Sequence, residues 1–161
     1  MKYVLAICVC LVIGCGKPDV VDKAVSRKAV AEKPLPKDFE SLKALAEKGD
    51  ARAQNSLGFM YLKGKGVEQD YKEAAKWTHK SAEQGLALAQ HNLGWMYYNN
   101  EVQGDDVTAY AWWNIAAANG NKDAMVLKIT VAENKTAEDI TKAEALVKEM
   151  AAKNPKLINN K

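Results

Sequence analysis

The side chains able to do covalent, redox or metal chemistry are few in this sequence, and most lie at its N-terminus. All three cysteines, Cys8, Cys10 and Cys15, fall within the first fifteen residues, and His79 and His91 are the only histidines. Neither histidine has the spacing of a metal-ligand motif such as H-E-x-x-H. We therefore expect no catalytic residue, no metal site and no cofactor.

The remaining polar motifs have structural explanations. Gly64-Lys65-Gly66 follows a predicted helix instead of a strand, and it lacks the Gly-Lys-Ser/Thr sequence of a phosphate loop. Carboxylates such as Asp70 and Asp105 fall where helices begin, and there they serve as caps. The 161 residues are 48% hydrophobic, which suits one domain with a core. A net charge of +3 predicts no nucleic-acid partner.

The first fourteen residues have the composition of an export signal. Lys2 precedes an uncharged run from Tyr3 to Gly14, which as a helix would span about 18 Å, too short to cross a bilayer. A basic start followed by a short apolar run predicts a secretory signal peptide. The alternative is an uncleaved membrane helix.

The end of this run, Val12-Ile13-Gly14-Cys15, resembles the lipobox of bacterial lipoproteins. The resemblance implies cleavage before Cys15 and acylation of that cysteine, which would anchor the chain to a membrane of the cell envelope. Gly16, in place of the aspartate of an inner-membrane retention signal, favours the outer membrane facing the periplasm if the source is Gram-negative. Residues 15–37 then form a flexible tether.

An internal repeat determines the architecture. Residues 46–61 and 82–97 are identical at ten of sixteen positions, and a second series of matches follows at an offset of 35. We expect full repeats at about 46–81 and 82–117, each made of two helices.

Within each repeat, the order of residue types predicts where the helices begin, end and pack. The first helix covers about 51–62 and ends at Gly64-Lys65-Gly66. Asp70 caps the second helix with Glu73 as a capping-box-like partner, and Gly85 supplies a left-handed residue after its end. In the second repeat the cap is Asp105 or Asp106. The expected buried stripes of the two second helices are Ala74, Trp77 and Ser81, and Ala109, Trp112 and Ala116.

Partial repeats flank these two units. Residues 38–48 read as a second helix without its first, 123–132 as a decayed first helix, and Thr136 as the cap of a last helix. We expect about seven helices between residues 38 and 152, and a frayed tail over 153–161.

The pattern A-x-A-Q-x-x-L-G-x-x-Y-x-x-G-x-G-V at 51–67, followed by Asp70 and Trp77, resembles the Sel-one-like repeat, a relative of the tetratricopeptide repeat. The resemblance implies an all-α solenoid of helix-turn-helix units. In the second repeat, residues 99–102 depart from the Gly-x-Gly of the pattern, so the geometry of that turn is open.

A solenoid presents one face of its first helices as a continuous concave surface, which is a candidate for binding. Subtracting the repeat pattern from that face leaves Arg52, Asn55, Ser56, Phe59 and Lys63, with Leu88, His91, Asn92, Trp95 and Asn99 as their counterparts in the second repeat. From these we take as candidate binding residues Arg52, Asn55, Phe59, His91, Asn92 and Trp95. Phe59 and Trp95 share a repeat position, and they either form an aromatic floor or pack between repeats. Tyr98 and Trp113 are further candidates.

These observations predict a lipid-anchored envelope protein that is not an enzyme and binds a protein or peptide as an adaptor or scaffold. One alternative is binding of a β-lactam or another cell-wall ligand, or weak β-lactamase activity, which has been described for some secreted relatives. Those relatives are rich in paired cysteines, whereas no cysteine follows Cys15 here. A third possibility is an immunity or stress-related lipoprotein.

Overall fold

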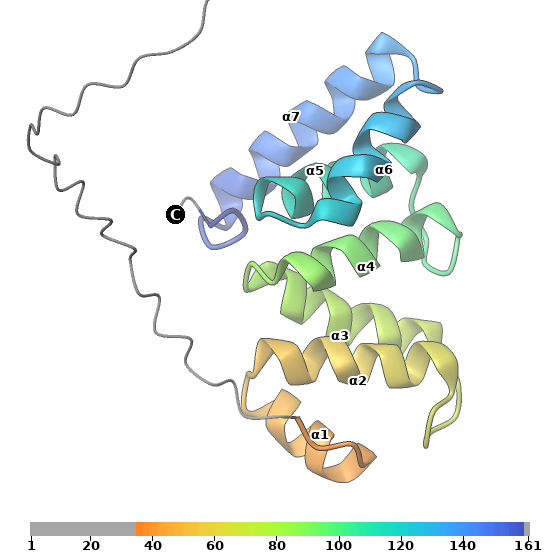
Figure 1. Ribbon diagram of the computed structural model, residues 1–161, viewed down its shortest axis with the longest axis vertical. Helices are drawn as coiled ribbons and strands as arrows, with labels where there is room; N and C mark the ends of the chain where they lie inside the picture. Colours follow the sequence, from red (N-terminus) through yellow and green to blue (C-terminus); the bar gives the residue numbers. More distant parts are fainter. Residues whose placement is uncertain (1–34, 160–161) are drawn as a thin grey trace, which may run out of the picture. The chain divides into compact units, whose positions relative to one another are not determined.

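The computed structural model describes residues 35–159, and this part of the chain is all-helical (Figure 1). The predicted signal peptide, Cys15 and most of the tether lie outside the described residues. In the described range, seven helices and no strands are found: α1 (Phe39–Glu47), α2 (Ala51–Lys63), α3 (Tyr71–Glu83), α4 (Ala87–Tyr98), α5 (Asp106–Ala118), α6 (Lys122–Ala132) and α7 (Ala137–Lys153). The fold is the predicted helical-repeat solenoid, with α2–α3 and α4–α5 as its two complete helix pairs.

Helices α3, α5 and α7 begin directly after the residues predicted to cap them, whereas α4 begins after Leu86, which makes no side-chain cap bond. Asp70 accepts hydrogen bonds from the first turn of α3, and Thr136 forms a reciprocal capping box with Asp139 on α7. Of the two candidates for α5, Asp105 is the cap. Glu73 does not complete a capping box, since the Asp70 N–H donates to the carbonyl of Tyr61 and the Glu73 carboxylate pairs with Lys76.

Close approach of the two helices in each repeat depends on a glycine in the first helix. A Cβ atom added to Gly58 would lie 2.4 Å from Oγ1 of Thr78, and one added to Gly94 would lie 2.4 Å from Nε1 of Trp113. The predicted stripes that face these helices are buried: Ala74, Trp77 and Ser81 on α3, and Ala109, Trp112 and Ala116 on α5.

The turn between the two helices of a repeat is built differently in the two copies. In the first copy Gly64 and Gly66 both have positive φ. In the second copy Asn100 takes the left-handed conformation with φ of 55°, a conformation that asparagine tolerates better than most residues. The departure from Gly-x-Gly therefore keeps a left-handed residue in the turn.

Helix α6 is in the position of the first helix of a third repeat, but it lacks the glycine that allows close helix packing in the two complete repeats. Ile129 stands at the position of Gly58 and Gly94, and its side chain is 64% exposed. The last helix, α7, packs mainly against α5 instead of α6, with Ala143 buried against Tyr110 and Ala111. The solenoid thus ends without a third complete helix pair.

The expectation of a frayed tail is wrong for residues 154–159. Leu157 is only 2% exposed and belongs to the core cluster that includes Leu93 and Ile115. The segment is held because its polar groups bond to the ends of earlier helices. Asn154 donates to the carbonyl of Glu83, and Asn159 donates to that of Gly85.

Candidate functional site

The six predicted binding residues lie on α2 and α4, the first helices of the two complete repeats. Arg52, Asn55 and Phe59 lie on α2, and His91, Asn92 and Trp95 lie on α4. We call these six residues, with Leu88 and Tyr98 of α4, the first-helix face. Leu88, the counterpart of Arg52 in the second repeat, is half-exposed.

Two of the predicted residues join the repeats directly. Nδ2 of Asn92 donates to Oδ1 of Asn55 over 3.0 Å, from α4 to α2. Asn55 is only 8% exposed, so this hydrogen bond is largely protected from water. Asn55 therefore belongs to the packing between repeats, whereas Asn92 reaches from it toward the surface.

The aromatic residues at the shared repeat position are exposed. Phe59 is 42% exposed and Trp95 is 37% exposed, so both rings reach the surface. The Lys65 ammonium group lies 5.2 Å from the centre of the Phe59 ring, within reach of a cation–π interaction.

The Trp95 ring is also held in place by neighbouring aromatic side chains. Its ring packs edge-on against Trp113 and Tyr98, with centroid distances of 5.7 and 5.9 Å. Trp113 of α5 is fully buried, and its Nε1 donates to the carbonyl of His91. Trp113, a further candidate from the sequence, is thus the buried base of this aromatic cluster, and Tyr98 is half-exposed at its edge.

The neutral ring of His91 is held in one tautomer by Trp95. Nε1 of Trp95 donates to Nε2 of His91 over 3.1 Å, so Nε2 is an acceptor and the ring proton of the neutral form lies on Nδ1. Burial lowers the pKa of His91, and the charge of Asp123 opposes this only in part. Among the described residues, none accepts a hydrogen bond from the buried Nδ1. At neutral pH the first-helix face therefore carries an uncharged histidine with one unsatisfied donor.

The other histidine serves the core. His79 on α3 is hydrogen-bonded to the Tyr97 hydroxyl over 2.8 Å, and its ring lies edge-on to Trp112. Burial lowers the pKa of His79 and raises that of Tyr97. Within residues 35–159 no group of histidine, cysteine and acidic side chains has the arrangement of a metal site. No helix in that range is long and apolar enough to span a membrane.

Comparison with known proteins gives consistent matches to one kind of repeat. The sequence profile of the Sel1 repeat matches residues 51–86 and 87–121. A protective antigen of uropathogenic Escherichia coli with an SLR fold is 36% identical over 74% of this chain, with a TM-score of 0.69. The chain spans only 26% of the length of that antigen.

A second solved structure is closer in length. A Sel1 repeat protein from Oxalobacter formigenes is 37% identical, with a TM-score of 0.54. The match covers 56% of this chain and 69% of that protein. No match was found among curated protein sequences.

Proposed function

Since the chain belongs to the Sel1 repeat family, we propose that it is a non-enzymatic adaptor that binds a protein or peptide through its first-helix face. The observation that carries this proposal is the exposure of Phe59, Leu88, Trp95 and Tyr98 on two adjacent first helices. Large exposed apolar side chains that gather on one face mark interaction sites more often than isolated ones do.

The arrangement of Trp95 suits a binding anchor. Its ring is already ordered by contacts with Trp113 and Tyr98, and its indole N–H is bonded to His91. A partner would therefore pay little conformational entropy to order this side chain, and preordered aromatic side chains dominate many interfaces.

Polar groups beside the aromatic rings suit the backbone of a bound segment. Asn92 carries both a donor and an acceptor beside the aromatic rings, and its Nδ2 also donates to Asn55. An extended peptide exposes carbonyl and amide groups that such side chains recognise, while Phe59 and Trp95 take its apolar side chains.

The proposal includes an anchor at Cys15 in the cell envelope, supported by the lipobox-like sequence 12–15. An acylated cysteine would hold the solenoid at the membrane surface, with residues 16–37 as a spacer. Metabolic labelling with an alkyne-bearing fatty acid tests this point. Labelling of the wild type but not of Cys15→Ser supports the anchor, and equal labelling of both overturns it.

The binding face is tested by crosslinking in intact cells that express the full chain. The variant Phe59→Ala/Trp95→Ala should capture at least about tenfold less of the crosslinked partner than the wild type does, because two aromatic anchor residues are removed. Tyr71→Ala is the matched control, since Tyr71 on α3 is 42% exposed, as Phe59 is, but lies outside the face. Equal capture by the double variant and the control would refute the assignment of the face.

A further inference from the structure

The C-terminal residues 154–159 occupy a groove across the ends of α3, α4 and α5 in the manner of a bound peptide. We call this the tail groove, formed by Glu83, Gly85, Gln90 and Asn119 around the Leu157 pocket. The carbonyl of Leu157 accepts hydrogen bonds from Nε2 of Gln90 over 2.8 Å and from Nδ2 of Asn119 over 2.7 Å. The backbone N–H of Asn159 donates to Oδ1 of Asn119 over 2.7 Å.

A single apolar side chain anchors the segment. Leu157 is 2% exposed and contacts the cluster that contains Ala82, Leu93 and Ile115. Pro155 and Lys156 on one side of it are exposed, as is Asn159 on the other. The groove therefore recognises an aliphatic side chain, the backbone around it, and flanking amide groups.

The internal repeat explains why a groove is present at this place. In the first repeat Gln84 donates both to Oε1 of Gln54 and to the carbonyl of Gly49. These two acceptors are therefore hydrogen-bonded without any contribution from the tail. The equivalent of Gln84 in the second repeat is Asn119, which is one methylene shorter. Asn119 donates to Gln90 and to the tail, and Asn159 of the tail bonds to Gly85, the equivalent of Gly49.

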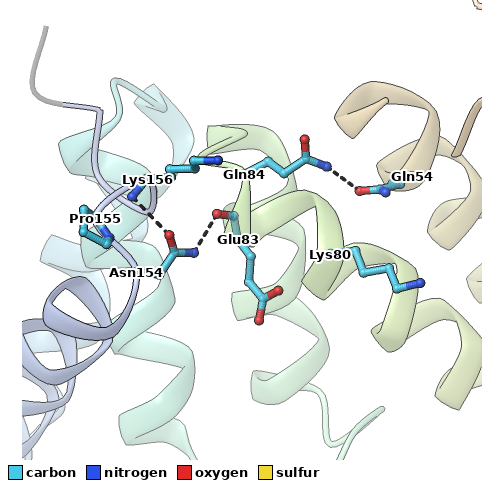
Figure 2. A pocket seen from close by; sticks show the side chains of 7 residues that line it. All are labelled: Gln54, Lys80, Glu83, Gln84, Asn154, Pro155 and Lys156. Atoms are coloured by element: carbon cyan, nitrogen blue, oxygen red, sulfur yellow. Dashed lines mark hydrogen bonds between the residues drawn. The ribbon is translucent and has the colours of Figure 1, made fainter. Parts of the chain in front are cut away.

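An open cavity continues the groove toward the first repeat. It has a volume of about 570 Å³, and its walls include Gln54, Lys80, Glu83 and Gln84 together with the start of the tail. Figure 2 shows Asn154 and Pro155 on one side of this cavity and Gln54 on the other. The chain's own tail leaves this space unfilled, because residues before Asn154 belong to α7.

We propose that the tail groove is a second peptide-binding site, whose ligand is an extended segment of a partner protein with a leucine-like anchor, and which the chain's own tail occupies in the free state. Release of the tail leaves the protein's own polar network in place. Gln90 keeps its bond to the carbonyl of Ala82, and Asn119 keeps its bond to Gln90. A partner segment that is longer at its N-terminal side would also fill the cavity, which gives it contacts that the tail lacks.

The test uses the full chain and a fluorescent peptide with the sequence of residues 154–161. The variant Leu157→Ala weakens the internal competitor, so it should bind the peptide at least about tenfold more tightly than the wild type does. A peptide with the same Leu→Ala change should bind the variant at least about tenfold more weakly than the original peptide. Circular dichroism establishes that the variant remains helical.

A second variant keeps the test decisive if Leu157→Ala perturbs the fold. Asn159→Ala removes the hydrogen bond to the Gly85 carbonyl at an exposed position and leaves the core intact. It should raise the affinity for the peptide by about fivefold. If neither folded variant binds the peptide better than the wild type, or if the two peptides bind equally, the proposal is wrong. Phe59→Ala/Trp95→Ala should leave this binding unchanged, so the two proposed sites fail or succeed separately.

Discussion

Replacing Gly94 by alanine should destabilise the protein, although alanine is the better helix former. The added methyl group would lie 2.4 Å from Nε1 and 2.6 Å from Cδ1 of Trp113. Ordinary contacts of a Cβ atom begin near 3.4 Å, so α4 and the Trp113 ring must separate by about 1 Å. Trp113 is fully buried, and its ring packs against Trp95 and Tyr98, so it cannot move without displacing them.

The expected cost follows from three contributions. Overpacking of a filled core costs about 1–3 kcal/mol, and a rigid indole ring places this site at the upper end. Separation of the helices also weakens the hydrogen bond from Trp113 to the His91 carbonyl, which contributes about 1 kcal/mol. The higher helix propensity of alanine offsets these losses by about 1 kcal/mol. We therefore expect a net loss of about 2–3 kcal/mol.

Urea denaturation followed by circular dichroism measures this difference directly. Ala145→Gly on the exposed side of α7 is the control, because it should lose about 1 kcal/mol through helix propensity alone. If Gly94→Ala is as stable as the wild type or more stable, then close helix approach is not what requires glycine at this position.

Three further changes test the electrostatics and the hydrogen bonds of the fold. Burial lowers the pKa of His79 and His91 below the ordinary value of 6.5, so the unfolded chain binds protons more readily than the folded one below that pH. The free energy of unfolding should therefore fall as the pH drops from 7 toward 5, and a variant with glutamine at both positions should show a flatter profile. Asp105→Ala removes the cap of α5 and should cost about 1 kcal/mol in urea denaturation; an unchanged midpoint would show that the cap is dispensable. Gln90→Met keeps the length of the side chain but removes its hydrogen bonds to three partners, and a loss of stability below about 1 kcal/mol would contradict their importance.

Features that depend on neighbours in sequence were predictable. Caps such as Asp70, Asp105 and Thr136 act within one turn of their own helix, so the residue type and its place before an apolar stripe are sufficient. The positive φ of Gly85 after the end of α3 follows from the same local logic. The repeat itself then determined which helices pair.

Features that depend on distant contacts were harder to predict. Exposure of Phe59 and Trp95 depends on what packs beneath them, and the indole ring of Trp113 stands where the first repeat has Thr78. The ordered tail bonds to Asn119, which stands where the first repeat has Gln84 and is one methylene shorter. That difference was present in the sequence, but its consequence required the position of a segment forty residues further along the chain.

The same tail has a consequence for how the molecule unfolds. Units of a solenoid normally contact only their neighbours, so the terminal unit can unravel alone. Here Asn154 bonds to the carbonyl of Glu83, 71 residues earlier, and so connects the end of the chain to the first complete repeat. Loss of α7 would uncover the Leu157 pocket in the middle of the helix stack. Cooperativity therefore extends over most of residues 35–159, and a partner that takes the place of the tail would change the folding equilibrium of the whole stack.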